Sequence, residues 1–121
     1  MSGIQLPPNS SLAFDPVDAL AAVADDRDLL KQMVELFCAD SPRMLMAVGK
    51  SVKEGDAKAL ARAAHALKGS VAIFGKSESL RAVECLELSG IAETMDDADA
   101  QFLSLELLVA ALEKDLVGFC R

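Results

Sequence analysis

The length, composition and charge of the chain exclude several classes of protein. Its 121 residues suit one domain, and a composition that is 52% hydrophobic but only 4% aromatic favours packed helices over sheets. The net charge of −7 opposes nucleic-acid binding, no apolar run is long enough to span a membrane, and the N-terminus lacks a signal-peptide pattern. We therefore expect a cytoplasmic protein that acts on proteins or small molecules, with no role at nucleic acids or membranes.

The sequence divides into a short arm and one domain. Residues 1–13 are predicted to form a flexible arm, because their glycine, prolines and serines oppose regular structure. Residues 14–121 are predicted to form the domain. Asp15 is a typical helix cap and Pro16 a typical first helical residue, which predicts a short helix to about Ala24.

Apolar residues at spacings of three and four predict a long helix from Asp28 to about Glu54. Pro42 lies inside this segment and removes one backbone donor, so we expect a bend there. Gly55 follows the last helical residue and is a typical helix end.

Two further helices are predicted after Gly55. Asp56 caps one that stops at Gly75, and its inward-facing positions are Leu60, Ala64, Leu67, Val71 and Phe74. The other opens at Ser77 and ends either at Gly90 or near Met95.

A last helix is predicted from around Asp97 to near the C-terminus, which gives four long amphipathic helices with short connections. They bury their apolar sides most simply as an antiparallel up-down-up-down bundle. The predicted fold class is therefore all-α: a four-helix bundle with a short extra N-terminal helix lying over one end.

The sequence holds a single histidine, His65, next to the apolar seam of its helix. Its neighbours on the helix surface are Ala61, Arg62, Lys68 and Gly69, with Ala72 a turn further along. Ala61, Gly69 and Ala72 are small, so they leave the imidazole ring accessible to another protein. A glycine inside a helix costs about 1 kcal/mol relative to alanine, so Gly69 serves either access to the ring or close helix packing.

Positive charge gathers around this histidine. The segment from Lys58 to Arg81 holds five basic residues and one acidic residue, a net charge of +4 in a chain of net charge −7. Lys68 places a cation one turn from the imidazole, where it can pair with a phosphoryl group or stay a solvated surface lysine. A basic island on an acidic body suits docking against an acidic pocket or a phosphate.

The three cysteines are Cys38, Cys85 and Cys120. They are odd in number, widely separated and embedded in apolar stretches, which predicts reduced thiols in the core rather than disulfides. A zinc site formed with His65 is the alternative, although the sequence has no C-x-x-C spacing to pre-form it.

The segment Ala64-His65-Ala66-Leu67-Lys68-Gly69-Ser70 resembles the A-H-x-L-K-G-S signature of the histidine phosphotransfer (HPt) family. Gly75 matches the helix-ending glycine of that family, and Leu86-Glu87 matches the Leu-Glu or Leu-Gln pair on its next helix. The coarse pattern covers about Asp15 to Leu116. The sequence departs from it at residues 71–74, where smaller or polar residues often precede the glycine.

This resemblance implies a phosphorelay intermediate. His65 would accept a phosphoryl group from the aspartyl phosphate of one receiver domain and pass it to the aspartate of another, as a phosphocarrier without its own kinase or hydrolase site. Lys68 would steady the phosphoryl group. Glu87 would accept a hydrogen bond from Nδ1, which leaves Nε2 as the nucleophile.

The resemblance also implies partners and a cofactor. The expected partners are response-regulator receiver domains and a hybrid sensor histidine kinase, and the docking surface would include Ala61, Arg62, Gly69 and Ala72. The chain would need no cofactor of its own, because the receiver would contribute Mg²⁺.

Two other classes of function stay open. One is a helical interaction module, or a degenerate HPt domain, that binds receivers without accepting phosphate. The other, a kinase dimerisation domain, also places a histidine on a helix but needs an attached ATP-binding domain, and the sequence holds no P-loop. The sequence is compatible both with a free-standing shuttle and with the end of a hybrid kinase.

Overall fold

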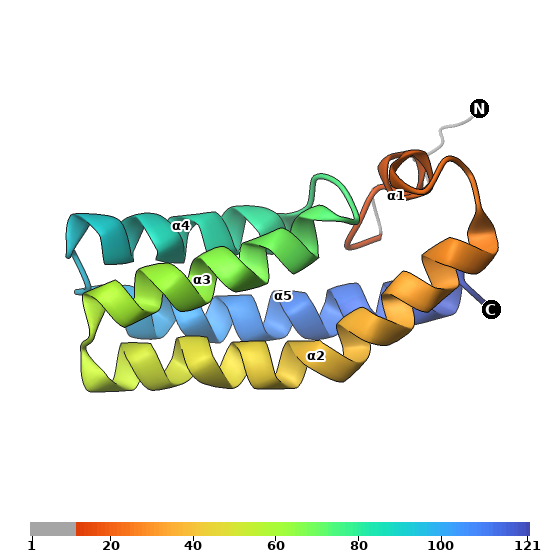
Figure 1. Ribbon diagram of the computed structural model, residues 1–121. Coiled ribbons are helices and arrows are strands. Elements are labelled where there is room, and N and C mark those ends of the chain that lie inside the picture. The colour runs from red at the N-terminus through yellow and green to blue at the C-terminus, as the bar shows by residue number, and fades with distance from the viewer. Residues whose placement is uncertain (1–11) are drawn as a thin grey trace, which may run out of the picture.

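The structure, a computed structural model, describes residues 12–121, which contain five helices and no strand (Figure 1). The helices are α1 (Pro16–Ala22), α2 (Arg27–Glu54), α3 (Ala57–Ala72), α4 (Glu78–Ala92) and α5 (Ala98–Phe119). The arm predicted for residues 1–13 lies outside the described residues except for Leu12 and Ala13. The backbone amide of Ala13 donates a hydrogen bond of 2.8 Å to the carboxylate of Asp115, which ties the start of the described chain to α5.

Side-chain caps explain where four of these helices begin. Each cap accepts a hydrogen bond from a backbone amide two or three residues later: Asp15, Asp26, Asp56 and Ser77. These bonds satisfy amides that have no partner inside the helix. At the other end of α2, Gly55 adopts a left-handed conformation with φ of +66°, as the sequence predicted for a helix stop.

Helices α2 to α5 form an antiparallel four-helix bundle, which confirms the predicted all-α fold class. Both α2 and α4 pack against α3 and α5, so α3 and α5 occupy opposite corners of the bundle. Figure 1 shows α3 nearest the viewer, α5 behind it, and α1 lying over one end. It also shows a bend in α2, the helix that contains Pro42.

The core is the apolar seam predicted from the sequence. All five predicted inward positions of α3 are buried: Leu60, Ala64, Leu67, Val71 and Phe74. Val83 and Leu86 of α4 are also buried, and so are Leu105 and Leu112 of α5. Because Ala64 is fully buried, His65, the next residue along α3, points about 100° away from the direction of the core.

Two helices end earlier than predicted. The first, α1, ends at Ala22 rather than near Ala24, because Ala24 adopts a positive φ of 52° that a right-handed helix excludes. The other, α3, ends at Ala72 rather than running to Gly75. Gly75 has a φ of +85° and packs against Asp18 of α1, so its glycine serves a turn and a close contact.

The cysteine prediction is wrong in one part. Cys38 and Cys120 are half-buried, but Cys85 is exposed. Cys85 precedes the buried Leu86, and successive helical residues point about 100° apart, so its side chain turns away from the core. No group of three or more possible metal ligands occurs in residues 12–121, so the described structure gives the zinc alternative no support.

Helices α3 and α4 approach each other closely at Gly90. A Cβ atom added to Gly90 would lie 2.6 Å from the backbone nitrogen of Ala61 and 2.7 Å from the carbonyl oxygen of Ala57. Backbone atoms cannot move aside as a flexible side chain can. Gly90 therefore sets the distance between the two helices.

Replacing Gly90 with alanine is expected to lower the free energy of unfolding by about 2 kcal/mol, because the new methyl group must force α3 and α4 apart. The midpoint of urea unfolding measures this loss. The matched control is Gly118→Ala, since a Cβ at this glycine of α5 meets nothing within 4 Å. Equal stability of the two variants would show that the close approach at Gly90 does not exist.

No helix within residues 12–121 has both the length and the apolar composition that crossing a membrane requires.

Candidate functional site

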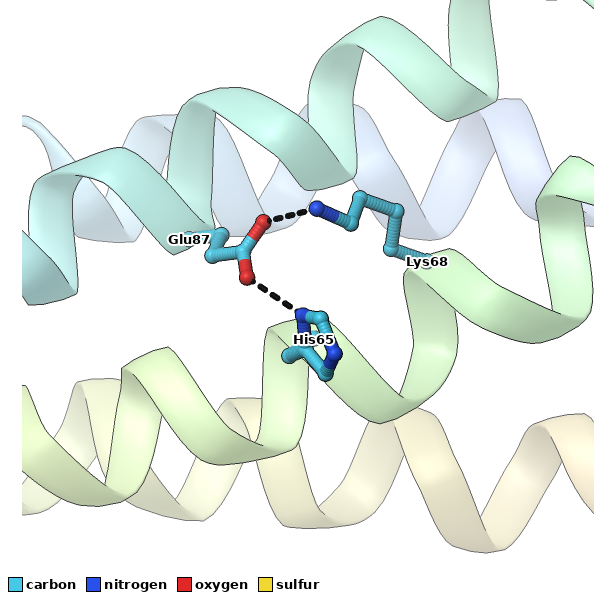
Figure 2. A network of polar contacts seen from close by, with 3 residues as sticks. All are labelled: His65, Lys68 and Glu87. Carbon is cyan, nitrogen blue, oxygen red and sulfur yellow. Dashed lines mark hydrogen bonds and ion pairs between the residues drawn. The ribbon is translucent and has the colours of Figure 1, made fainter.

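Three side chains from two helices meet at the surface between α3 and α4 (Figure 2). The Nδ1 atom of His65 lies 2.7 Å from Oε2 of Glu87. The ammonium group of Lys68 donates a hydrogen bond of 2.5 Å to the other carboxylate oxygen, Oε1. Glu87 therefore joins a histidine and a lysine that stand one turn apart on α3.

The three residues differ sharply in exposure. The His65 side chain is 70% exposed, whereas that of Glu87 is 12% exposed and that of Lys68 is 29% exposed. Figure 2 shows the second ring nitrogen of His65, Nε2, on the side away from Glu87. The ring is thus held at one nitrogen by a nearly buried group and open to solvent at the other.

The Glu87 contact fixes the chemical roles of the two ring nitrogens. An ionised carboxylate can only accept hydrogen bonds, so in the neutral ring the proton resides on Nδ1 of His65. Nε2 then carries the lone pair, and it is the exposed atom. The arrangement presents a nucleophilic nitrogen to solvent in a defined orientation.

The pKa of the Glu87 carboxyl is lowered from its ordinary value of 4.5. The main cause is the hydrogen bond from Lys68; partial burial opposes the change, and the hydrogen bond from His65 adds to the lowering. Each donor stabilises the ionised form of the carboxyl group. Glu87 is consequently an anion at neutral pH, as the orientation of the ring requires.

The lowered pKa of Glu87 predicts a pH-dependent contribution to stability. Because the folded pKa lies below the unfolded value near 4.5, the stabilisation is complete above that value and is lost as pH falls through the folded pKa. Glu87→Gln cannot ionise, so wild type should be the more stable protein at neutral pH, and the difference should shrink as the solution is acidified. Chemical unfolding across this pH range measures it, and a difference independent of pH would contradict the assignment.

Two explanations of Gly69 were open, access to the ring and close helix packing, and the surroundings of His65 distinguish between them. A Cβ atom added to Gly69 meets nothing within 4 Å, and the residue is exposed. Of the two explanations, close helix packing is therefore excluded. Ala72 and Arg62 are exposed on the same helix, whereas the backbone of Ala61 packs against Gly90.

The sequence did not reveal that Lys68 is already paired. Its ammonium group binds Glu87 rather than standing free beside the ring. The spacing of three residues between His65 and Lys68 places both on the side of α3 that faces α4, and that spacing was the available signal. The other members of the basic island are exposed: Lys58, Arg62, Lys76 and Arg81.

The candidate site is an open surface rather than a pocket. A hollow of about 600 Å³ lies near the start of α4 and is lined by Phe14, Lys76 and Arg81 among others, but not by His65. An exposed nucleophile without an enclosing cavity cannot bury a small substrate.

These features define a class of protein: a small helical bundle that presents one oriented imidazole on its surface. The family model for the Hpt domain matches residues 32–115, so the chain belongs to the Hpt domain family. Its role is histidine phosphotransfer in a phosphorelay, and domains of this family interact with the receiver domains of two-component systems.

A solved structure supports the fold. The chain is similar to histidine-containing phosphotransfer protein B (HptB) from Pseudomonas aeruginosa PAO1, with a TM-score of 0.82 and 21% sequence identity. The match covers 91% of this chain and 96% of that one. A search of curated proteins gave no match.

Proposed function

We propose that His65 is the phosphoacceptor of this domain and that Nε2 is the reacting atom. The observation that supports it most is the 2.7 Å contact between Nδ1 and Glu87, which leaves a lone pair on the exposed nitrogen. Nε2 would attack the phosphorus of an aspartyl phosphate on a receiver domain. The new N–P bond forms as the P–O bond to the aspartate breaks, and the aspartate leaves as a carboxylate.

Glu87 would act as a positioning residue and offset charge in this step. Attack by a neutral imidazole leaves positive charge on the ring, and the proton stays on Nδ1. The carboxylate that faces Nδ1 lowers the energy of this product. Transfer to the next receiver reverses the step: its aspartate attacks the phosphorus, and neutral His65 is the leaving group.

Lys68 would bind the phosphoryl group once that group has been transferred to His65. Its ammonium group is bound to Glu87 and 29% exposed, so a rotation of its flexible side chain can carry it towards the phosphoryl oxygens. The new negative charge would compete with Glu87 for the lysine. Mg²⁺ and the acidic pocket that complete the reaction would belong to the receiver.

The docking surface would be the exposed part of α3 around the ring, with Arg62, Gly69 and Ala72 in contact with the receiver. Ala61 would border this surface while packing against Gly90. The exposed basic residues of the island would attract an acidic receiver pocket. A hybrid sensor histidine kinase would be the source of the phosphoryl groups.

The test is to incubate the protein with a panel of phosphorylated receiver domains and follow the label. We expect transfer to this chain from at least one receiver, and a product that is stable in base and labile in acid, as phosphohistidine is. Return of the label to a second, unphosphorylated receiver would establish the relay. A chain that binds receivers tightly but never becomes labelled would instead be an interaction module.

A further inference from the structure

Gly90 lies against two successive turns of α3. It is a buried residue of α4, and the α3 atoms closest to an added Cβ are the backbone nitrogen of Ala61, at 2.6 Å, and the carbonyl oxygen of Ala57, at 2.7 Å. Both atoms belong to the helix backbone and cannot rotate out of the way. Only glycine therefore fits here while α3 and α4 keep their present spacing.

The contact at Gly90 and the site at His65 are one turn apart on both helices. On α4, Glu87 precedes Gly90 by three residues, and on α3, His65 follows Ala61 by four. Residues three or four apart lie on the same side of a helix, about 5–6 Å from each other. The Gly90 contact and the pair formed by His65 and Glu87 are therefore consecutive contacts between the same two antiparallel helices.

Glu87 holds His65 from the opposite helix. Figure 2 shows its side chain reaching from α4 to His65 and Lys68, both on α3. The two hydrogen bonds, of 2.7 Å and 2.5 Å, are thus made across the space between the helices. The Glu87 side chain is only 12% exposed, so neighbouring atoms restrict how far it can extend. Its contact with Nδ1 depends on the distance between α3 and α4.

Helix α4 is also held on its other side. Ser89, next to Gly90, donates a hydrogen bond of 3.1 Å to the side-chain oxygen of Gln101 on α5. At this level α4 therefore contacts α3 through its backbone and α5 through a side chain. A group inserted between α3 and α4 must displace a helix, since no flexible side chain at the contact can absorb it.

We propose that Gly90 is a positioning residue of the phosphotransfer site: the close backbone contact that it permits sets the reach of Glu87 to Nδ1 of His65. Gly90 touches no reacting atom and acts only through Glu87. The inference rests on the proposed function, in which Glu87 keeps the proton on Nδ1 and leaves Nε2 as the nucleophile.

The expected displacement is large enough to break the contact with the ring. Ordinary contacts begin at about 3.5 Å, so a Cβ that would meet Ala61 at 2.6 Å must move the helices apart by about 1 Å. The same shift would lengthen the 2.7 Å contact between Nδ1 and Oε2 to roughly 3.7 Å, beyond the hydrogen-bond range of about 2.7–3.2 Å. A misplacement of about 1 Å can cost about 100-fold in rate.

The first test is ¹H–¹⁵N NMR of the imidazole in the unphosphorylated chain, at a pH at which the ring is neutral. We expect the wild type to carry its proton on Nδ1, and Gly90→Ala to share the proton between both nitrogens. The matched control is Gly49→Ala in α2, where the new methyl group would meet the ring of Phe102 on α5 at 2.7 Å. It crowds the bundle elsewhere and should leave the proton on Nδ1. Wild-type ring signals in Gly90→Ala would overturn the proposal.

Transfer from a phosphorylated receiver gives the second readout. Gly90→Ala should slow transfer by about 10-fold to 100-fold, and Gly49→Ala by less than about 2-fold. In a chain that already carries Glu87→Ala, adding Gly90→Ala should cost less than about 2-fold more, because the contact that it disrupts is already absent. Equal losses with and without the Glu87 carboxylate would show that Gly90 acts through general stability, which would overturn the proposal.

Glu87→Asp tests the same reach without inserting anything between the helices, and so covers the case in which Gly90→Ala does not fold. The shorter side chain withdraws the carboxylate by about 1.5 Å, the length of one C–C bond. We expect this variant to lose the fixed Nδ1 proton and to transfer as slowly as Gly90→Ala. A proton that stays on Nδ1 in Glu87→Asp would overturn the proposal. A wild type that is never labelled would contradict the proposed function, whereas the NMR comparison, which needs no phosphorylation, still decides whether Gly90 positions Glu87.

Discussion

His65→Gln is expected to accept no phosphoryl group from any receiver that phosphorylates the wild type. The amide of glutamine has no nucleophilic nitrogen, so we expect the transfer rate to fall by at least about 1,000-fold. Because the wild-type side chain is 70% exposed, the substitution removes little packing and should leave the unfolding midpoint close to that of the wild type. Rapid-quench transfer assays with one phosphorylated receiver provide the measurement.

The control for this experiment is receiver binding. His65→Gln keeps Gly69, Ala72 and the basic residues around the site, so its affinity for the unphosphorylated receiver should change little. Loss of transfer together with retained binding would assign a chemical role to His65. Continued labelling of the variant would place the acceptor elsewhere in the chain.

Gly69→Gln is expected to reduce the rate of transfer by about 10-fold or more while raising the stability of the protein. The side chain of glutamine would project into open space beside the imidazole and keep the receiver away, since nothing lies within 4 Å of a Cβ at this position. The same change removes a helical glycine, which should stabilise α3 by up to about 1 kcal/mol. Transfer kinetics and urea unfolding on the same preparation measure both effects.

Two matched variants separate bulk from backbone effects. Gly69→Ala should be stabilised similarly but should transfer at nearly the wild-type rate, because a methyl group is small. Gly118→Gln changes another open glycine, on α5, and should leave transfer unchanged. If Gly69→Gln transfers as fast as Gly69→Ala, Gly69 does not provide access for the receiver.

The sequence predicted the fold well where local chemistry decides it. The caps Asp56 and Ser77 and the spacing of the apolar residues locate the starts of α3 and α4, because both signals act within one or two helical turns. Helix ends were less predictable. The end of α3 before Gly75 depends on packing against Asp18 of α1, a contact between segments far apart in sequence.

The site was predictable only in part for the same reason. The family resemblance implied the contact between Glu87 and Nδ1 of His65, whereas spacing within α3 placed only His65 and Lys68 on one side. Their link through Glu87 requires a particular distance between α3 and α4. Gly90 sets that distance by its contact with Ala61. Glu87 lies one turn before Gly90, and His65 one turn after Ala61, so the close approach brings carboxylate and ring together. No pattern within one helix encodes this geometry.

The outer side of α5 escaped sequence analysis altogether. Leu105, Leu112 and Leu116 of this helix are buried. Leu103 and Leu107 are leucines of the same helix, but their side chains point to solvent. An apolar helix gives no sign of which of its sides faces the core until its neighbours are known.

The central claim is that Nε2 of His65 carries the phosphoryl group while Nδ1 keeps its proton beside Glu87. Long-range ¹H–¹⁵N NMR of the imidazole, recorded before and after phosphorylation by a receiver, tests it most directly. We predict that the Nε2 signal shifts to a phosphorylated nitrogen and that Nδ1 stays protonated and hydrogen-bonded. A phosphoryl group on Nδ1, or a ring unchanged in a labelled protein, would contradict the account.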